Sequence, residues 1–199
     1  LALKTPPEDL GQRLHQATQG SPFFIEETIK DLLEEGFLVI GEGLAADYEL
    51  SQLPINTKIS EVIGDRISRI PETPRRVVEA LAIHGASTGL RLLTATTCLP
   101  PEEVLSGLQH LRQRGMLRES LSDQKLTDYS LLHRQIGDTI LRSLSAKRLK
   151  ALHAMAGMAL EECYPAALER IIYLDPLARH FDAAGLARKA FFYTHKAGE

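Results

Sequence analysis

The sequence contains only two cysteines in 199 residues, Cys98 and Cys163, and they show neither a disulfide framework nor the spacing of zinc ligands. This shortage excludes a small secreted scaffold held by disulfides and favours a reducing, cytoplasmic compartment. We expect both thiols to be buried packing residues. Apolar runs are also short, because none approaches the roughly 18 to 20 residues that a membrane-spanning helix needs. The sequence therefore predicts a soluble cytoplasmic protein without membrane association.

Motifs that cradle nucleotide phosphates or carry out catalysis are likewise missing. No Gly-x-x-x-x-Gly-Lys-Ser/Thr loop occurs, so the chain lacks the backbone cradle and lysine that hold β- and γ-phosphates. The serines stand at expected helix starts, where capping explains them, rather than beside a base. The seven histidines form no His-x-x-x-His pair with a nearby carboxylate or thiolate. We therefore expect neither a catalytic centre nor a metal site.

Positive charge is sparse where a nucleic-acid-binding protein would concentrate it. The formal net charge is −3, and the first 59 residues carry an excess of acidic side chains. Arg112, Arg114 and Arg118 form a small cluster in an otherwise neutral segment. Proteins that bind phosphate backbones usually present a basic face. The charge pattern therefore argues against strong DNA binding.

What the sequence does contain is a set of helix signals in a composition that is 44% hydrophobic and 25% charged, which is typical of a globular protein with a core. A capping box at Thr5–Glu8 predicts a first helix that stops at Gly20. Ser21 and Pro22 predict the N-cap and first turn of a second helix, which stops at Gly36.

A small hairpin and a third helix are expected next. The hairpin would pair Phe37–Ile40 with Tyr48–Leu50, because glycines and polar residues separate these apolar segments. The third helix would begin near Asn56, place apolar residues on one face and end at Pro71.

The stretch from Thr73 to His133 organises the chain as three helices and a two-stranded wing. After a first helix and a loop at Ser87–Gly89, the second and third helices are expected at Arg91–Thr97 and Pro101–Arg114. The wing would consist of Met116–Glu119 and Lys125–Leu132. Helical spacing in the third helix places apolar residues inward, and these are Val104, Leu105, Leu108 and Leu111. Gly115 is expected to adopt the left-handed conformation that ends this helix.

The remainder of the chain is predicted to be helical. A helix follows His133, and Ser145 caps a longer amphipathic helix. Residues 166–184 and 186–198 are typical of successive helices in a stacked array.

Two segments carry a resemblance to a known family, and the first is Gly20–Glu27, GSPFFIEE, followed by Asp31–Leu38, DLLEEGFL. It resembles the lid segment of STAND-class AAA+ ATPases, usually written GNPFFVEE. In that class the proline lies against the adenine ring of the nucleotide, so the resemblance implies that Pro22 is a nucleotide contact. An ordinary first-turn proline is the alternative interpretation.

The second segment is Tyr129–His133, YSLLH, which is similar to the aromatic-x-x-His motif at the end of the winged helix in that class. The aligned histidine there senses the nucleotide diphosphate, which implies the same role for His133. An imidazole can donate a hydrogen bond to a phosphate oxygen and titrates near neutrality. Leu132 and Gly137–Asp138 depart from the family pattern, which would weaken sensing. A helix-start histidine satisfied by local backbone is the alternative.

The resemblance covers nearly the whole chain and implies a mainly α fold. Residues 1–54 would form an AAA+ lid-like helical segment with a hairpin, residues 55–144 a winged-helix domain with short β-hairpins, and residues 145–199 the start of a tetratricopeptide-like array. The first residue is Leu rather than Met, which suggests a piece of a longer polypeptide. The resemblance implies a parent with an ATPase core that binds ATP or ADP, whereas this segment itself holds no cofactor. Parents with this layout include LuxR-type transcription activators and multidomain cyclases or kinases.

The sequence thus predicts a non-enzymatic regulatory segment of a STAND ATPase, which senses nucleotide state in signal transduction or transcription regulation. Leu132 and Ile136 would point into the core, and His133 would point toward Pro22. The partners would be the ATPase core and a protein bound at the C-terminal helices. One alternative is a DNA-binding winged-helix transcription factor, in which residues 101–114 enter a major groove. The other is a helical scaffold that binds a partner peptide.

Overall fold

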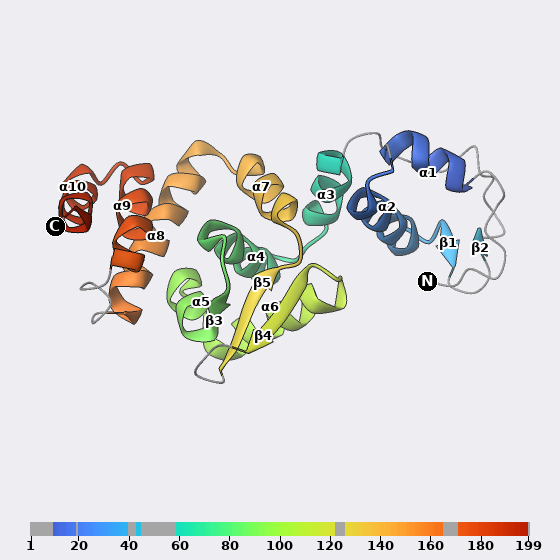
Figure 1. Ribbon diagram of the computed structural model, residues 1–199. Coiled ribbons are helices and arrows are strands. Elements are labelled where there is room, and N and C mark those ends of the chain that lie inside the picture. The colour runs from blue at the N-terminus through green and yellow to red at the C-terminus, as the bar shows by residue number, and fades with distance from the viewer. Residues whose placement is uncertain are drawn as a thin grey trace. The chain divides into compact units, whose positions relative to one another are not determined.

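The computed structural model describes residues 10–18, 20–39, 43–44, 59–121, 126–164 and 171–198 (Figure 1). Helices dominate these residues, and the strands form two small antiparallel sheets, which confirms the predicted mainly α fold with short β-hairpins. The chain divides into two compact units, Leu1–Arg69 and Ile70–Glu199. The third helix thus belongs to the first unit and all later described helices belong to the second, while the expected boundaries after residues 54 and 144 stay predictions.

The first unit is built around two capped helices. Its elements are α1 (Leu10–Thr18), α2 (Pro22–Glu34), β1 (Leu38–Val39), β2 (Gly43–Leu44) and α3 (Ile59–Ser68). The backbone N–H of Phe24 donates to the Ser21 Oγ over 3.5 Å, which confirms the predicted cap. Leu10, Leu14, Leu32 and Leu38 form one buried apolar cluster. The turn after α2 therefore returns β1 to the same core.

The hairpin of the first unit differs in part from the prediction. Leu38 pairs with Leu44, and Val39 pairs with Gly43, so the second strand lies closer to the turn than expected. The expected strand Tyr48–Leu50 and the capping box Thr5–Glu8 lie outside the described residues.

Ion pairs connect α2 to α3. Glu27 and Arg66 form a fully buried ion pair, and Arg66 Nη2 also contacts Glu34 Oε1 at 2.8 Å. One turn further, Arg69 Nη1 lies 3.0 Å from Asp31 Oδ1. A buried ion pair is costly unless both charges are satisfied, so these contacts fix the orientation of α3 against α2. Glu27 is the last residue of the GSPFFIEE segment, and its role in this structure is to anchor α3.

The second unit begins with three helices and a three-stranded sheet. The elements are α4 (Glu72–His84), β3 (Thr88–Gly89), α5 (Leu90–Thr97), α6 (Pro101–Gln113), β4 (Leu117–Leu121) and β5 (Thr127–Leu131). The strand order is β3-β5-β4, with both pairs antiparallel. Gly85 and Gly115 end α4 and α6 with φ angles of 66° and 64°. The predicted helices, the wing and the left-handed stop at Gly115 are all found.

Three local expectations in this region were wrong. Ser87–Gly89 was expected as a loop, but Thr88 and Gly89 form β3, because Tyr129 and Asp128 of β5 pair with them. Leu105 is 45% exposed, since Val104, Gly107, Leu108 and Leu111 form the buried face of α6. Cys98 is exposed rather than buried, and its φ of 52° places it at the left-handed end of α5. Cys163 is buried, as expected.

The rest of the second unit is helical, as predicted. It consists of α7 (Arg134–Ser143), α8 (Ala146–Cys163), α9 (Ile171–Ala183) and α10 (Ala187–Ala197). Ser145 Oγ accepts from the N–H of Arg148 at 3.2 Å, which confirms the predicted cap of α8. Helix α8 packs against α4 and α5 as well as α9 (Figure 1). Gly157 permits close approach, because a Cβ there would lie 2.8 Å from the Phe181 ring.

Candidate functional site

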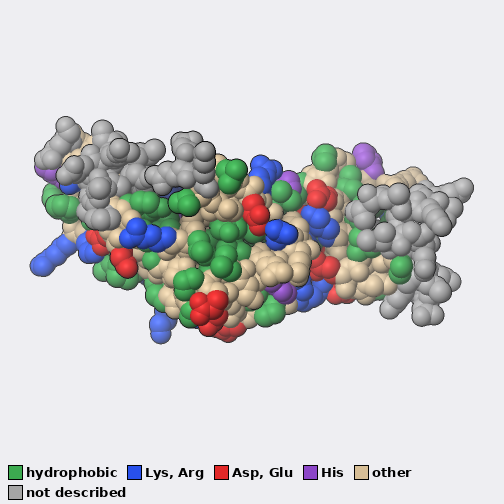
Figure 2. All heavy atoms as spheres, turned by 90° about the horizontal axis from the view of Figure 1, so that it is seen from below, with side chains coloured by type: hydrophobic (Ala, Val, Ile, Leu, Met, Phe, Trp, Pro, Cys, Tyr) green, Lys and Arg blue, Asp and Glu red, His purple; other side chains and the backbone are tan. Residues whose placement is uncertain are grey.

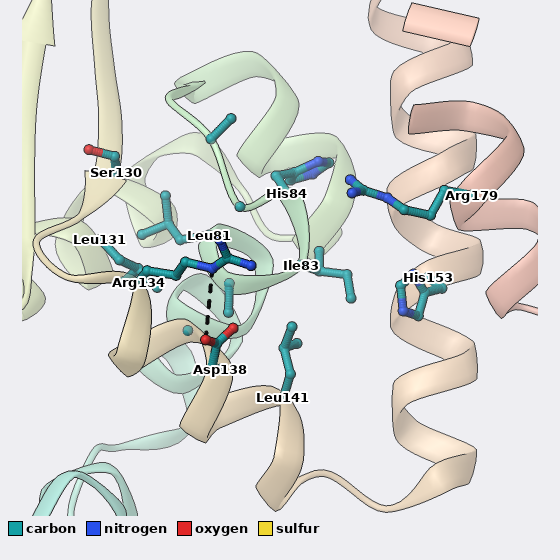
Figure 3. A pocket seen from close by; sticks show the side chains of 14 residues that line it. Leu81, Ile83, His84, Ser130, Leu131, Arg134, Asp138, Leu141, His153 and Arg179 are labelled. Atoms are coloured by element: carbon teal, nitrogen blue, oxygen red, sulfur yellow. Dashed lines mark ion pairs between the residues drawn. The ribbon is translucent and has the colours of Figure 1, made fainter. Parts of the chain in front are cut away.

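A cavity of about 660 Å³ in the second unit is the candidate functional site. The C-terminal end of α4, strand β5 and helices α7, α8 and α9 contribute its walls (Figure 3). A volume of this size lies within the range of about 300–1,000 Å³ that is usual for small-molecule sites. Its polar lining residues are Ser130, Arg134, Asp138, His84, His153 and Arg179.

Local sequence explains why these elements surround a cavity. Helix α4 stops at Gly85, so the chain turns away immediately after His84. Helix α7 approaches α4 closely because Gly137 faces it: a Cβ at this position would lie 3.2 Å from Leu131 Cδ1 and 3.7 Å from Ala82. Ile136 and Ile140, which are almost fully buried, secure α7 in this position.

The charged groups of the cavity come from opposite walls. Arg134 Nε lies 3.8 Å from Asp138 Oδ2, one turn further along α7. Arg179 extends from α9 as part of the cavity lining (Figure 3), and its charge acts on His153 and His180. Among the described residues, Arg179 forms no ion pair with a carboxylate. The lining thus contains two arginines and one aspartate, and one of the arginines, Arg134, is 93% exposed.

The histidines at this site form a connected set that extends into the core. His153 Nδ1 lies 3.0 Å from His180 Nδ1, so one ring must donate and the other must accept. The ring centroids of His84 and His180 are 5.8 Å apart, and His84 Nε2 is 2.8 Å from Thr96 Oγ1. The set therefore joins α4, α5, α8 and α9 through side chains.

Burial keeps these imidazoles neutral. Desolvation lowers the pKa of His84 to about 4, and it lowers that of His180 to about 3, with the neighbouring histidines and Arg179 adding repulsion. The pKa of His153 is also lowered, by burial and then by the charge of Arg179. Near neutral pH each ring therefore provides one donor and one acceptor rather than a charge.

The sequence-predicted site residues occupy different parts of the chain. Pro22 is exposed in the first turn of α2, in the first unit. His133 is half-buried in the second unit at the N-cap position of α7, and its side chain does not cap the helix. Ile136 is fully buried as predicted, whereas Leu132 is only half-buried. The proximity of His133 to Pro22 stays a prediction.

Sequence reasoning missed the residues that line the cavity. His133 is not among them, but the residue that follows it, Arg134, is. The Arg134–Asp138 pair has the i, i+4 spacing of helical ion pairs and could have been noticed. No local pattern, however, connects His84 with His153 and Arg179, because their elements meet only in the folded chain.

Several further observations bear on the site. No set of three or more His, Cys, Asp or Glu side chains within the described ranges is arranged to hold a metal ion. No helix in the part of the chain that the structure describes is long and apolar enough to cross a membrane. In comparisons with known proteins, the sequence matches no family model and no curated protein.

Proposed function

We propose that this chain is a non-catalytic, cytoplasmic regulatory segment of a STAND-type ATPase, in which the start of α7 relays nucleotide state. The observation that carries the proposal is the position of His133 at the junction of β5 and α7. A group bound there can act on α7 directly. Because Ile136 and Ile140 embed α7 in the core, a displacement of its first turn must also involve α4.

In this proposal Pro22 and His133 contact ADP or ATP that is held mainly by an ATPase core. The exposure of Pro22 supports the proposal, since an adenine ring could stack on it. An imidazole at a helix start can donate to a phosphate oxygen, with the positive end of the helix dipole adding to the attraction. The chain would then exist in two arrangements, one with His133 in contact with the nucleotide and one without. The nucleotide favours the first because it binds that arrangement more tightly.

The test is calorimetric titration of the chain with ADP, with AMP as the control that lacks the second phosphate. We expect weak binding of ADP by the isolated chain, and sub-micromolar affinity would contradict the idea that most phosphate contacts lie elsewhere. In a parent protein, His133→Ala should lower the affinity for ADP by roughly ten- to a hundredfold, since a hydrogen bond to a charged group contributes about 1.5–3 kcal/mol.

The matched control is His195→Ala, which removes an exposed histidine from α10. His195→Ala should retain the melting temperature, because exposed substitutions usually change stability by about half a kcal/mol or less. His133 is half-buried, but in this proposal its imidazole serves the nucleotide, so we expect His133→Ala to lower the melting temperature little. If His133→Ala melts several degrees lower but binds ADP normally in the parent, His133 is a structural residue.

A protein-binding role for the C-terminal helices is the second function that a specific observation favours. Phe191 and Phe192 of α10 are 72% and 56% exposed, and Arg188, His195 and Lys196 lie on the same face. Exposed aromatic surface bordered by polar groups often marks a protein interface. Replacing both phenylalanines with serine should abolish capture of a partner while the helical circular dichroism is retained.

The structure offers less support for DNA binding. The first turn of α6 presents Glu102 and Glu103, both exposed, where a recognition helix would approach phosphates. On the coloured part of the face in Figure 2, Lys and Arg side chains alternate with acidic and apolar ones.

A further inference from the structure

We propose that the cavity of the second unit binds a small organic anion, whose carboxylate or phosphate head contacts Arg134 and Arg179 and whose apolar body packs against the aliphatic wall. This site goes beyond the proposed nucleotide relay, because it requires neither Pro22 nor His133.

The first step of the argument is the charge of the two arginines. In Figure 3 their side chains extend toward one another from α7 and α9. The side chain of Arg134 is 93% exposed, so it stands at the mouth of the cavity, and its printed contact with Asp138 is a long one of 3.8 Å from Nε to Oδ2. Arg179 has no carboxylate partner among the described residues. Guanidinium groups bind carboxylates and phosphates through two parallel hydrogen bonds, so either arginine can hold an anionic head, Arg179 from the wall formed by α9 and Arg134 from the mouth.

The second step is the neutral polar groups between the arginines. His153 uses Nδ1 for His180 and can offer Nε2 to a ligand. Ser130 adds a hydroxyl group that can donate to an anion. The charge of Arg179 lowers the pKa of both His153 and His180, which shows that its positive field acts on this wall. A bound anion would counteract the positive field of Arg179.

The third step is the size and polarity of the remaining wall. Leu81, Ile83 and Leu141 line the cavity, and Leu131 continues the apolar surface along β5. A free inorganic ion would leave this surface and most of the 660 Å³ unused. Ligand sites commonly combine such an apolar lining with a few polar groups that orient the ligand. The arrangement thus favours an amphipathic organic anion over a bare phosphate ion.

The experiment uses ligands that vary the head and the body separately. Phenylacetate and phenyl phosphate share the aromatic body and differ in the head. Phenylacetamide keeps the shape of phenylacetate without the charge, and inorganic phosphate has no apolar body. Each compound is titrated into the full chain and followed by NMR. The signals observed are the imidazole proton resonances of His84 and His153, because both residues line the cavity.

We expect both aromatic anions to shift these two resonances in a saturable way at millimolar concentration. They should also raise the apparent pKa of His153, because a bound negative charge stabilises the imidazolium form. Phenylacetamide and inorganic phosphate should bind at least tenfold more weakly. A stronger response to phenyl phosphate than to phenylacetate would identify phosphate as the preferred head, and the reverse would identify carboxylate.

Variants test the assignment of individual side chains. Arg134→Gln and Arg179→Gln should each lower the affinity for the aromatic anions roughly tenfold or more, since each removes a charged hydrogen-bond donor. Arg142→Gln is the matched control, because Arg142 is an exposed arginine of α7 that does not line the cavity. Asp138→Asn should strengthen binding severalfold, because it removes the carboxylate that competes for Arg134.

The outcomes are decisive for this site alone. Equal binding of phenylacetamide and phenylacetate would overturn the proposal, as would unchanged affinity in both arginine variants. Absence of any saturable shift of His84 or His153 with the aromatic anions at millimolar concentration would overturn it as well. Because none of these measurements involves ADP or His133, their failure would leave the nucleotide relay intact, and failure of the relay would leave the cavity site intact.

Discussion

Acidification should destabilise the second unit through its buried histidines before most carboxylates are protonated. The folded-state pKa values of His84 and His180 are lowered from 6.5 to about 4 and about 3. A histidine whose pKa is lowered by folding takes up protons first in the unfolded chain. Its contribution is therefore complete above the unfolded pKa near 6.5 and is lost as the pH falls toward the folded pKa.

The magnitude follows from the difference in proton uptake. At about pH 5 an unfolded histidine is almost fully charged, whereas His84 in the folded chain is about one-tenth charged, so the free energy of unfolding falls by about 2 kcal/mol. His180 contributes a loss of similar size over the same interval. At about pH 4 the loss from His84 reaches about 3 kcal/mol. The groups that face this set are Arg179, Arg134 and Asp138, in addition to His153.

The assay is urea unfolding at about pH 7 and about pH 5, followed through the imidazole resonances of the folded and unfolded states. Two variants remove the titrating group but keep the hydrogen-bonding atom. His84→Gln retains a polar atom near the Nε2 position that contacts Thr96, and His180→Asn retains one near the Nδ1 position that contacts His153. Each should reduce the loss between the two pH values by about 2 kcal/mol.

His195→Asn is the control, because His195 is exposed on α10. It should show the same pH dependence as the unaltered chain. If all four proteins lose the same stability between neutral pH and about pH 5, the buried histidines do not govern acid stability and the reasoning is refuted.

Further predictions concern packing, charge and nucleic acid. Gly157→Ala should lower the free energy of unfolding by about 1–2 kcal/mol, because the added Cβ meets the Phe181 ring at 2.8 Å. Gly64→Ala, in a helix with no atom within 4 Å of that position, should instead raise the melting temperature. Glu27→Gln should cost about 1.5–3 kcal/mol in urea unfolding, because it removes the buried carboxylate that Arg66 contacts and leaves the pair with Glu34. A mobility-shift assay at low salt should show no duplex bound to the chain, and retention of duplex would contradict the proposed protein-binding role.

Sequence signals predicted those parts of the fold that local chemistry determines. Ser21 and Ser145 start helices by capping, and Gly115 ends α6 in the left-handed conformation, so these positions could be predicted directly from the sequence. Strand β3 was missed because it is only two residues long and depends on pairing with β5, far along the chain.

The candidate site could be predicted far less completely. His133 was selected by resemblance, and its location at a helix start agrees with the expected element. The cavity next to it depends on where α8 and α9 pack against α4, which no periodic pattern encodes. Burial lowers the pKa of both His84 and His180, yet nothing in their neighbours along the chain marks them as buried.

Helix α8 has a consequence for how the protein can be divided. Leu152 and Ala156 pack with Ile83 of α4, while Ala159 and Leu160 share a second cluster with helices α9 and α10. Each end of the helix thus completes a different part of the interior. Cutting the chain before α8 would uncover the core of the three-helix region, and cutting after it would uncover the inner face of α8 itself. Truncation is therefore a poor way to assign roles to the two ends of this unit. Single surface substitutions leave α8 covered on both sides, so they can distinguish the role of one end from that of the other.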